Sequence, residues 1–400
     1  MKNRNFIVMW LRDSLIAFAS ALTSSSVLSG QLLHEGLGED KISLYLAFVP
    51  FVNLGVSLAF SGITARVKRT IPAYTLLCLM SGVFTACFAL VFAFSFKENT
   101  LLFLLMMTGC LVTAVTAIRT IFDYKLPCEV MASDEYSLYV SVGGILGSVF
   151  GIAGGLLLSF FYKKLDFTLV SCAAFILAGV SLCTASLINR SLKLKSTGKA
   201  EVPDGKSKSS ANIGALIKNK SFKRLALPNF MRGIGMAAVP MMTVFAVNAG
   251  VLKETDSAAV TVCTYLGTLI SCTLYAFLSK RIKIKTLCIG GAVLFCALVP
   301  SLGMGRAGFF VCYTLAYIGY YVVCCAVPDL VYRNIPSDIM SVFHTWRLAL
   351  STVGTTAATA VMGKLLGSVS PVFLLAAAAL SHIICAAAYA AEFSKKRINN

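Results

Sequence analysis

Acidic side chains in apolar surroundings are the groups of this sequence best placed to do chemistry. Of its 17 Asp and Glu residues, only Asp13, Asp123 and Asp329 lie within or at the ends of long apolar stretches. An ionisable group is costly inside a lipid bilayer, so each of them is a functional candidate. Arg119 lies four residues before Asp123, and Arg333 lies four residues after Asp329. At this spacing opposite charges share a helix face and can pair.

A carboxylate that is partly buried and exchanges an arginine partner changes its affinity for a proton. This favours a role in coupling or gating for five residues, namely Asp13, Arg119, Asp123, Asp329 and Arg333. Two alternatives stay open. The two Arg–Asp pairs can be structural latches at the membrane edge, and Asp13 can be an interfacial anchor.

Polar side chains near the middle of the apolar stretches are candidates to contact a solute. Four tyrosines at positions i, i+4, i+7 and i+8 place phenols along one helix face, which suits an organic solute with apolar or aromatic parts. The alternative is a hydrogen-bonded helix interface. Arg232 could attract an anionic solute, pair with Asp13 or extend to the membrane surface. The candidate cavity residues are Ser20, Thr23, Ser24, Gln31, Arg232, Tyr313, Tyr317, Tyr320 and Tyr321. His344 and Arg347 form a candidate pH switch, because histidine titrates near neutral pH.

The elements that position these residues must be membrane helices. The chain has 400 residues, 58% hydrophobic and 13% charged, with a mean hydropathy of +0.82, which excludes an ordinary soluble enzyme. Twelve apolar stretches of 20 to 27 residues are helical in length rather than barrel strands. They are 14–33, 43–65, 70–96, 99–118, 136–162, 167–189, 225–249, 257–279, 286–305, 307–328, 339–363 and 365–391.

The basic residues indicate how the spans are oriented. With the N-terminus in the cytoplasm, 25 of the 35 Lys and Arg residues fall in cytoplasmic segments, which predicts that both ends lie inside. A basic linker over 191–222 separates a six-span half over 1–190 from a second over 223–400. We expect this linker to lie near anionic lipid and not to bind nucleic acid. The 14 cysteines lie mostly within apolar runs, so they predict neither a disulfide framework nor a metal site.

Short echoes relate the two halves. The pattern S-D-x-x-S stands at 133–137 and again at 337–341, before the fifth and eleventh spans. Basic segments follow the second and eighth spans, at 65–69 and 280–283. These echoes predict an all-α integral membrane protein of two pseudo-symmetric six-helix bundles.

On these features the chain resembles the major facilitator superfamily of secondary transporters. The family motif G-x-L-A-D-R-x-G-R-R corresponds here to Gly62-Ile63-Thr64-Ala65-Arg66-Val67-Lys68-Arg69, in which the acidic residue is absent. The fifth span carries Gly143, Gly147, Gly151 and Gly155 on one helix face, which permits close approach of another helix. The Gly-Pro step associated with exporters in this span is absent.

The resemblance implies a solute cavity between the two bundles, lined by spans 1, 4, 7 and 10 and exposed alternately to each side. It predicts a monomeric, multi-pass transporter of a small organic solute in a bacterial cytoplasmic membrane, without a cofactor. Coupling to protons is the simplest case, sodium is the alternative, and export is slightly favoured. A lipid flippase or a non-transporting sensor of the same fold stays open. A membrane-embedded enzyme is disfavoured because the scattered acids form no catalytic cluster.

Overall fold

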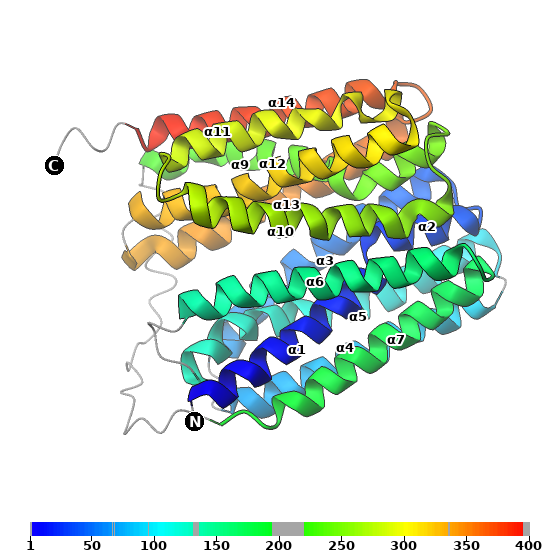
Figure 1. Cartoon of the computed structure of the whole chain (residues 1–400), viewed down its shortest axis with the longest axis horizontal. Coiled ribbons are helices and arrows are strands. Elements are labelled where there is room, and N and C mark those ends of the chain that lie inside the picture. Colours follow the sequence, from blue (N-terminus) through cyan, green and yellow to red (C-terminus); the bar gives the residue numbers. More distant parts are fainter. Residues whose placement is uncertain are drawn as a thin grey trace. The chain divides into compact units, whose positions relative to one another are not determined.

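The described secondary structure of this computed structural model is helical throughout. The structure describes residues 2–65, 67, 69–94, 96–130, 136–193, 220–334 and 337–394. The helices are α1 (Lys2–Leu22), α2 (Ser25–His34), α3 (Glu39–Ala65), α4 (Thr70–Ala93), α5 (Glu98–Val130), α6 (Tyr136–Tyr162), α7 (Phe167–Asn189), α9 (Lys220–Asn248), η1 (Glu254–Asp256), α10 (Ser257–Leu278), α11 (Ile284–Phe295), η2 (Cys296–Leu298), η3 (Pro300–Gly303), α12 (Gly305–Asn334), α13 (Ser337–Leu365) and α14 (Pro371–Glu392) (Figure 1). Arg66 and Lys68 of the predicted motif, residues 133–135 and most of the predicted linker lie outside the described residues.

The helices follow the predicted spans. Eleven helical segments, within the described residues, are long and apolar enough to cross a membrane. Helix α13 covers the remaining predicted span, 339–363. Large apolar side chains such as Phe51, Phe103 and Phe373 are 57–71% exposed, as expected of surfaces that face lipid. The predicted orientation stays a prediction, because helix bounds do not distinguish the two sides of a membrane.

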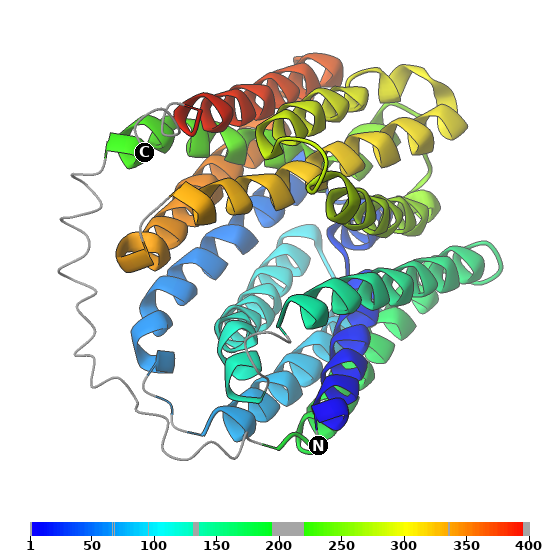
Figure 2. The same ribbon diagram turned by 60° about the vertical axis from the view of Figure 1, so that its left-hand side comes forward.

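The chain forms two compact units. The first comprises 1–195 together with 240–269, and the second comprises 196–239 together with 270–400. In the first unit α1 packs on α6 and α7, and α4 packs on α5 and α7. In the second unit α11 lies between α12 and α14, which Figure 2 also shows. The predicted boundaries at 190 and 223 stay a prediction.

Glycines allow the helices of the first unit to approach closely. A Cβ atom on Gly82 of α4 would lie 2.7 Å from the carbonyl oxygen of Gly179 on α7, and one on Gly179 would lie 2.6 Å from that of Gly82. Gly151 and Gly155, two of the four predicted glycines of α6, serve the same purpose, because a Cβ on either would clash with Tyr265 or Val262 of α10, whereas Gly143 and Gly147 make ordinary contacts with α1. Gly147 faces Ala17 of α1, while Gly155 faces Val262 at the start of α10. The close helix contact predicted from the glycine spacing is therefore present.

The α4–α7 contact predicts that G179A destabilises the protein. The added methyl group meets a backbone carbonyl that cannot move by itself, so we expect a loss of about 1–3 kcal/mol in the free energy of unfolding. G144A on α6 is the matched control, because a Cβ there has open space within 4 Å. It should leave stability unchanged or raise it by up to about 1 kcal/mol. Thermal unfolding of both variants in detergent measures the difference, and equal stability would contradict the packing described here.

Candidate functional site

Two adjoining cavities lie within the first unit. Each has a volume of about 260 Å³. They share five lining residues, Thr23, Val49, Thr85, Val112 and Thr113. One is lined mainly by hydroxyl side chains and an arginine, and we call it the polar cavity. The other is lined mainly by aliphatic and aromatic side chains, and we call it the apolar cavity.

Helical spacing explains why hydroxyl groups converge on the polar cavity. Thr113 and Thr116 are three residues apart on α5, and Ser81 and Thr85 are four apart on α4, so each pair shares one helix face. The hydroxyls of Ser81 and Thr116 lie 3.2 Å apart across the two helices. Among the described lining residues, the polar side chains are Ser20, Thr23, Asn53, Ser81, Thr85, Thr113, Thr116 and Arg119. Two of these, Ser20 and Thr23, belong to the predicted cavity set.

Arg119 lines the polar cavity one helical turn from Thr116, and it lacks the predicted acidic partner. Its side chain is 7% exposed, and within the described part of the chain its Nε and Nη1 atoms have no hydrogen-bond partner. The carboxylate of Asp123 instead accepts a hydrogen bond of 2.5 Å from the hydroxyl of Tyr74 on α4. The spacing of Arg119 and Asp123 permits a pair along α5, but a neighbouring helix supplies a competing donor. Arg119 therefore lines the cavity with a charge that no described acid neutralises, while its Nε and Nη1 atoms lie below the accessible surface.

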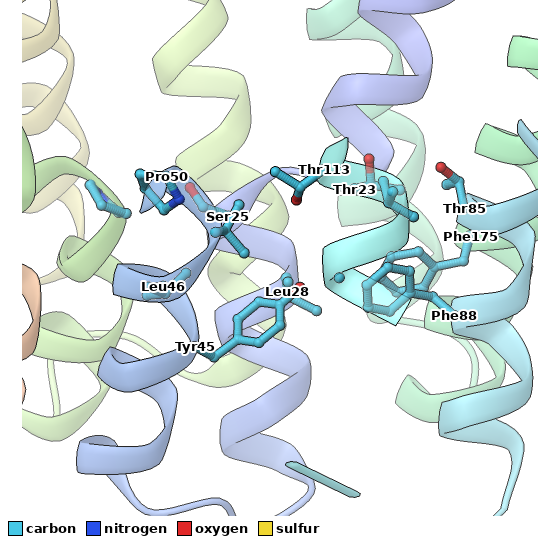
Figure 3. A pocket seen from close by; sticks show the side chains of 14 residues that line it. Thr23, Ser25, Leu28, Tyr45, Leu46, Pro50, Thr85, Phe88, Thr113 and Phe175 are labelled. Carbon is cyan, nitrogen blue, oxygen red and sulfur yellow. The ribbon is translucent and has the colours of Figure 1, made fainter. Parts of the chain in front are cut away.

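Aromatic rings form the apolar cavity. The rings of Phe88 and Phe175 stack at 5.2 Å between centroids. Tyr45 of α3 reaches the wall because α5 has a glycine there, and a Cβ on Gly109 would lie 2.8 Å from the tyrosine hydroxyl oxygen. Figure 3 shows the threonine side chains along the upper part of this cavity and the rings of Tyr45, Phe88 and Phe175 below them. Polar and apolar groups thus line two adjoining cavities that share part of their wall.

The first span is broken where the two cavities meet. Helix α1 ends at Leu22 and α2 begins at Ser25. Ser24 caps α2 by accepting a hydrogen bond of 3.3 Å from the backbone N–H of Val27, and its hydroxyl lies 2.5 Å from that of Thr261 on α10. The apolar pattern predicted one continuous helix over 14–33. The run of one threonine and three serines over 23–26 was the available signal for the break, because serine favours helix N-caps.

Asp13 belongs to a buried network that begins with its neighbour Arg12. Arg12 is 1% exposed, and its Nη2 atom lies 2.6 Å from Oδ1 of Asp13. Tyr139 of α6 donates a hydrogen bond to the other carboxylate oxygen. Arg12 also donates to Asn189 of α7 at 3.4 Å and lies over the ring of Tyr74, with 4.7 Å from Cζ to the ring centroid. The network thus joins α1 to three other helices.

Each of the three predicted aspartates accepts a hydrogen bond from a tyrosine on another helix. The pairs are Asp13 with Tyr139, Asp123 with Tyr74, and Asp329 with Tyr275, the last at 2.8 Å. The cost of burying an acid was enough to single out the aspartates in the sequence. The tyrosines and Arg12 were missed, because the rotation of each helix about its axis decides which donors face an acid.

The predicted cavity residues of the second unit pack against one another. Tyr313 is 1% exposed and its ring lies 5.8 Å from that of Phe309. Tyr317 contacts Tyr313, Tyr320 and Tyr321 through its ring. Arg232 is buried and donates to Sγ of Cys324 at 3.4 Å. In the first unit, Gln31 of α2 donates to Glu35 at 2.7 Å. These residues stay candidates to line the cavity.

The remaining predicted residues lie on α12 and α13. The side chains of Arg333 and His344 fall outside the described residues, so only their helices are placed. Arg347 is buried within α13. The pH switch proposed for His344 and Arg347 stays a prediction.

The chain is similar in structure to solved transporters along almost its whole length. No protein-family model and no curated protein matches it. It matches a mutant form of the nucleoside transporter NupG with a TM-score of 0.72 at 14% identity, covering 97% of this chain and 100% of that one. It matches the POT family transporter PepTSo with a TM-score of 0.72 at 11% identity, covering 99% of each chain. A bacterial homologue of the human lysosomal transporter Spinster, in an inward-facing and unoccupied conformation, also matches. Its TM-score is 0.60 at 14% identity, and the match covers 99% of this chain and 95% of that one. At these identities the likeness shows the fold, and all three are transporters rather than enzymes.

The buried network predicts that removing Arg12 alone is worse than removing both members of the ion pair. R12Q leaves the Asp13 charge with Tyr139 as its hydrogen-bond donor, so we expect a loss of about 3 kcal/mol in the free energy of unfolding. R12Q/D13N should recover most of that loss, because no uncompensated charge remains. Denaturant titration in mixed micelles measures the free energy of unfolding of the parent protein, R12Q and R12Q/D13N.

The control for R12Q is R4Q. Arg4 is exposed and makes a single hydrogen bond of 3.3 Å to the carbonyl oxygen of Ser191, so its loss should change stability by less than about 0.5 kcal/mol. A double variant as unstable as R12Q would show that Arg12 acts by packing and not by neutralising Asp13.

Proposed function

Since the chain has the fold of the major facilitator superfamily, as its sequence predicted, we propose that it is a secondary active transporter. It moves a small organic solute across the membrane by alternating access, coupled to protons, with export slightly favoured over uptake. The proposal places it as a monomer in the cytoplasmic membrane of a bacterium.

The observation that carries this proposal is a polar cavity inside a bundle of membrane-crossing helices. Water-filled or ligand-filled space is where polar side chains and irregular backbone are tolerated at membrane depth. Here hydroxyl groups, a buried arginine and a broken helix occur together in the first unit. In transporters, discontinuous helices of this kind commonly form solute sites.

Asp13 is the proposed coupling group. Its side chain is 25% exposed, so a proton can reach it, while Arg12 and Tyr139 hold its carboxylate. A conformational change that alters either contact changes the affinity of Asp13 for a proton. Asp123, Asp329 and Arg333 are proposed to gate. Tyr74 and Tyr275 hold the first two acids through contacts that can break and reform as helices move.

Solute-driven proton movement tests the function before the solute is identified. Purified protein is reconstituted in vesicles that contain a pH-sensitive dye, and a panel of organic acids, nucleosides, peptides, sugars and amines is added in turn. At least one solute should change the internal pH, and protein-free vesicles should show no change. A sodium gradient replaces the proton gradient in a parallel series. Failure of every solute under every imposed gradient would overturn the transporter proposal and favour a non-transporting sensor.

D13N should uncouple solute movement from protons. With the titratable group removed, we expect gradient-driven accumulation to fall at least about tenfold, while exchange of labelled for unlabelled solute continues. D40N is the matched control, because Asp40 lies exposed in the first turn of α3. Unchanged accumulation by D13N would show that Asp13 is a structural anchor.

A further inference from the structure

We propose that the solute is a small amphipathic organic monoanion, whose anionic group binds Arg119 in the polar cavity and whose apolar body enters the apolar cavity. The claim that this ligand is transported rests on the proposed function. The claim that it binds rests on the cavity alone.

The first step is the charge of Arg119. A guanidinium that is 93% buried among membrane helices requires a partner, because an isolated charge at this depth is costly. The same unit supplies such a partner for Arg12, whose guanidinium forms an ion pair with Asp13. No described carboxylate of this unit pairs with Arg119, since Asp123 accepts its hydrogen bond from Tyr74. The missing partner is then a ligand group.

The second step is the type of ligand group. Arg119 lines the polar cavity, and its Nε and Nη1 atoms have no hydrogen-bond partner among the described residues, so its charge can pair with an anionic oxygen of a carboxylate or phosphonate. The described residues that line the two cavities include no Asp or Glu. A cationic ligand would therefore meet a like charge with no acid to offset it. A neutral ligand would leave the guanidinium without a counter-charge.

The third step is the body of the ligand. The apolar cavity adjoins the polar cavity at the shared Thr85 and Thr113, and its wall is formed by the rings of Tyr45, Phe88 and Phe175 (Figure 3). Each cavity measures about 260 Å³, somewhat below the roughly 300–1,000 Å³ typical of sites for drug-sized ligands. A ligand with a carboxylate at one end and a single ring or a short branched chain at the other matches both the polar and the apolar cavity. A compact inorganic anion would fill only the polar cavity.

Four probes test these steps on the purified full-length protein by titration calorimetry in detergent. They are 3-phenylpropanoate, its neutral amide, 2-phenylethylammonium and acetate. We expect 3-phenylpropanoate to bind at least about tenfold more tightly than each of the other three, because only it has both the charge and the ring. Equal affinity for the amide or the ammonium compound would overturn the proposal, as would no measurable binding of 3-phenylpropanoate.

Variants then assign the binding to Arg119. R119Q should weaken 3-phenylpropanoate at least about tenfold and leave the weak binding of the amide unchanged. R119K keeps the charge but replaces the planar guanidinium by an ammonium group, so its affinity should lie between those of R119Q and the parent protein. R190Q removes an exposed arginine at the end of α7 and should bind as the parent protein does. Parent-like affinity in R119Q would overturn the assignment, and the probe comparison on the parent protein decides the ligand class even where R119Q fails to fold.

The two proposals fail in different ways. Binding that depends on Arg119, without transport of any solute in vesicles, would support the ligand class and overturn the transporter function. Transport of a neutral or cationic solute that R119Q leaves unchanged would support the function and overturn the ligand class.

Discussion

Every charge buried among membrane helices needs a counter-charge or a full set of hydrogen bonds, and the first unit is organised around this constraint. Arg12 and Asp13 satisfy it as an ion pair on α1. Tyr139 of α6 and Asn189 of α7 complete the hydrogen bonds of that pair. Gly154 of α6 also lies close to α1, where an added Cβ would come within 3.2 Å of Ala21 and Phe18. Helix packing and charge neutralisation thus support one another.

The same constraint makes Arg119 informative. A sequence selected only for stability would often carry an apolar residue at this position, since replacing a buried charge by an apolar group is often neutral or stabilising. The chain instead keeps an arginine in the wall of a cavity whose other described polar lining residues are uncharged. Local conflicts of this kind are expected at functional sites. The site is also asymmetric, because the aromatic wall lies on one side of the shared threonines only.

Span positions were predictable because they depend on one quantity, the thickness of the bilayer, which sets how many apolar residues must follow one another. The glycine contacts of α6 were predictable for a similar reason, since their four-residue spacing belongs to a single helix. Partners on different helices were not. Arg119 and Asp123 have a spacing that permits a pair, yet Tyr74 lies on α4 and takes the carboxylate. The tyrosines of α12 do share a face, but His382 of α14 packs against Tyr320 on that face.

The break between α1 and α2 connects the site to a neighbouring helix. Thr23 lines both cavities, and the next residue, Ser24, caps α2 and contacts Thr261 of α10. The ends of helices are held by fewer backbone hydrogen bonds than their interiors, so the direction of a span changes most easily there. A solute that fills both cavities would therefore contact Thr23, at the break between α1 and α2. At this break the first span can bend with less loss of backbone hydrogen bonds than within either helix. The Ser24–Thr261 contact joins this point to α10 within the first unit.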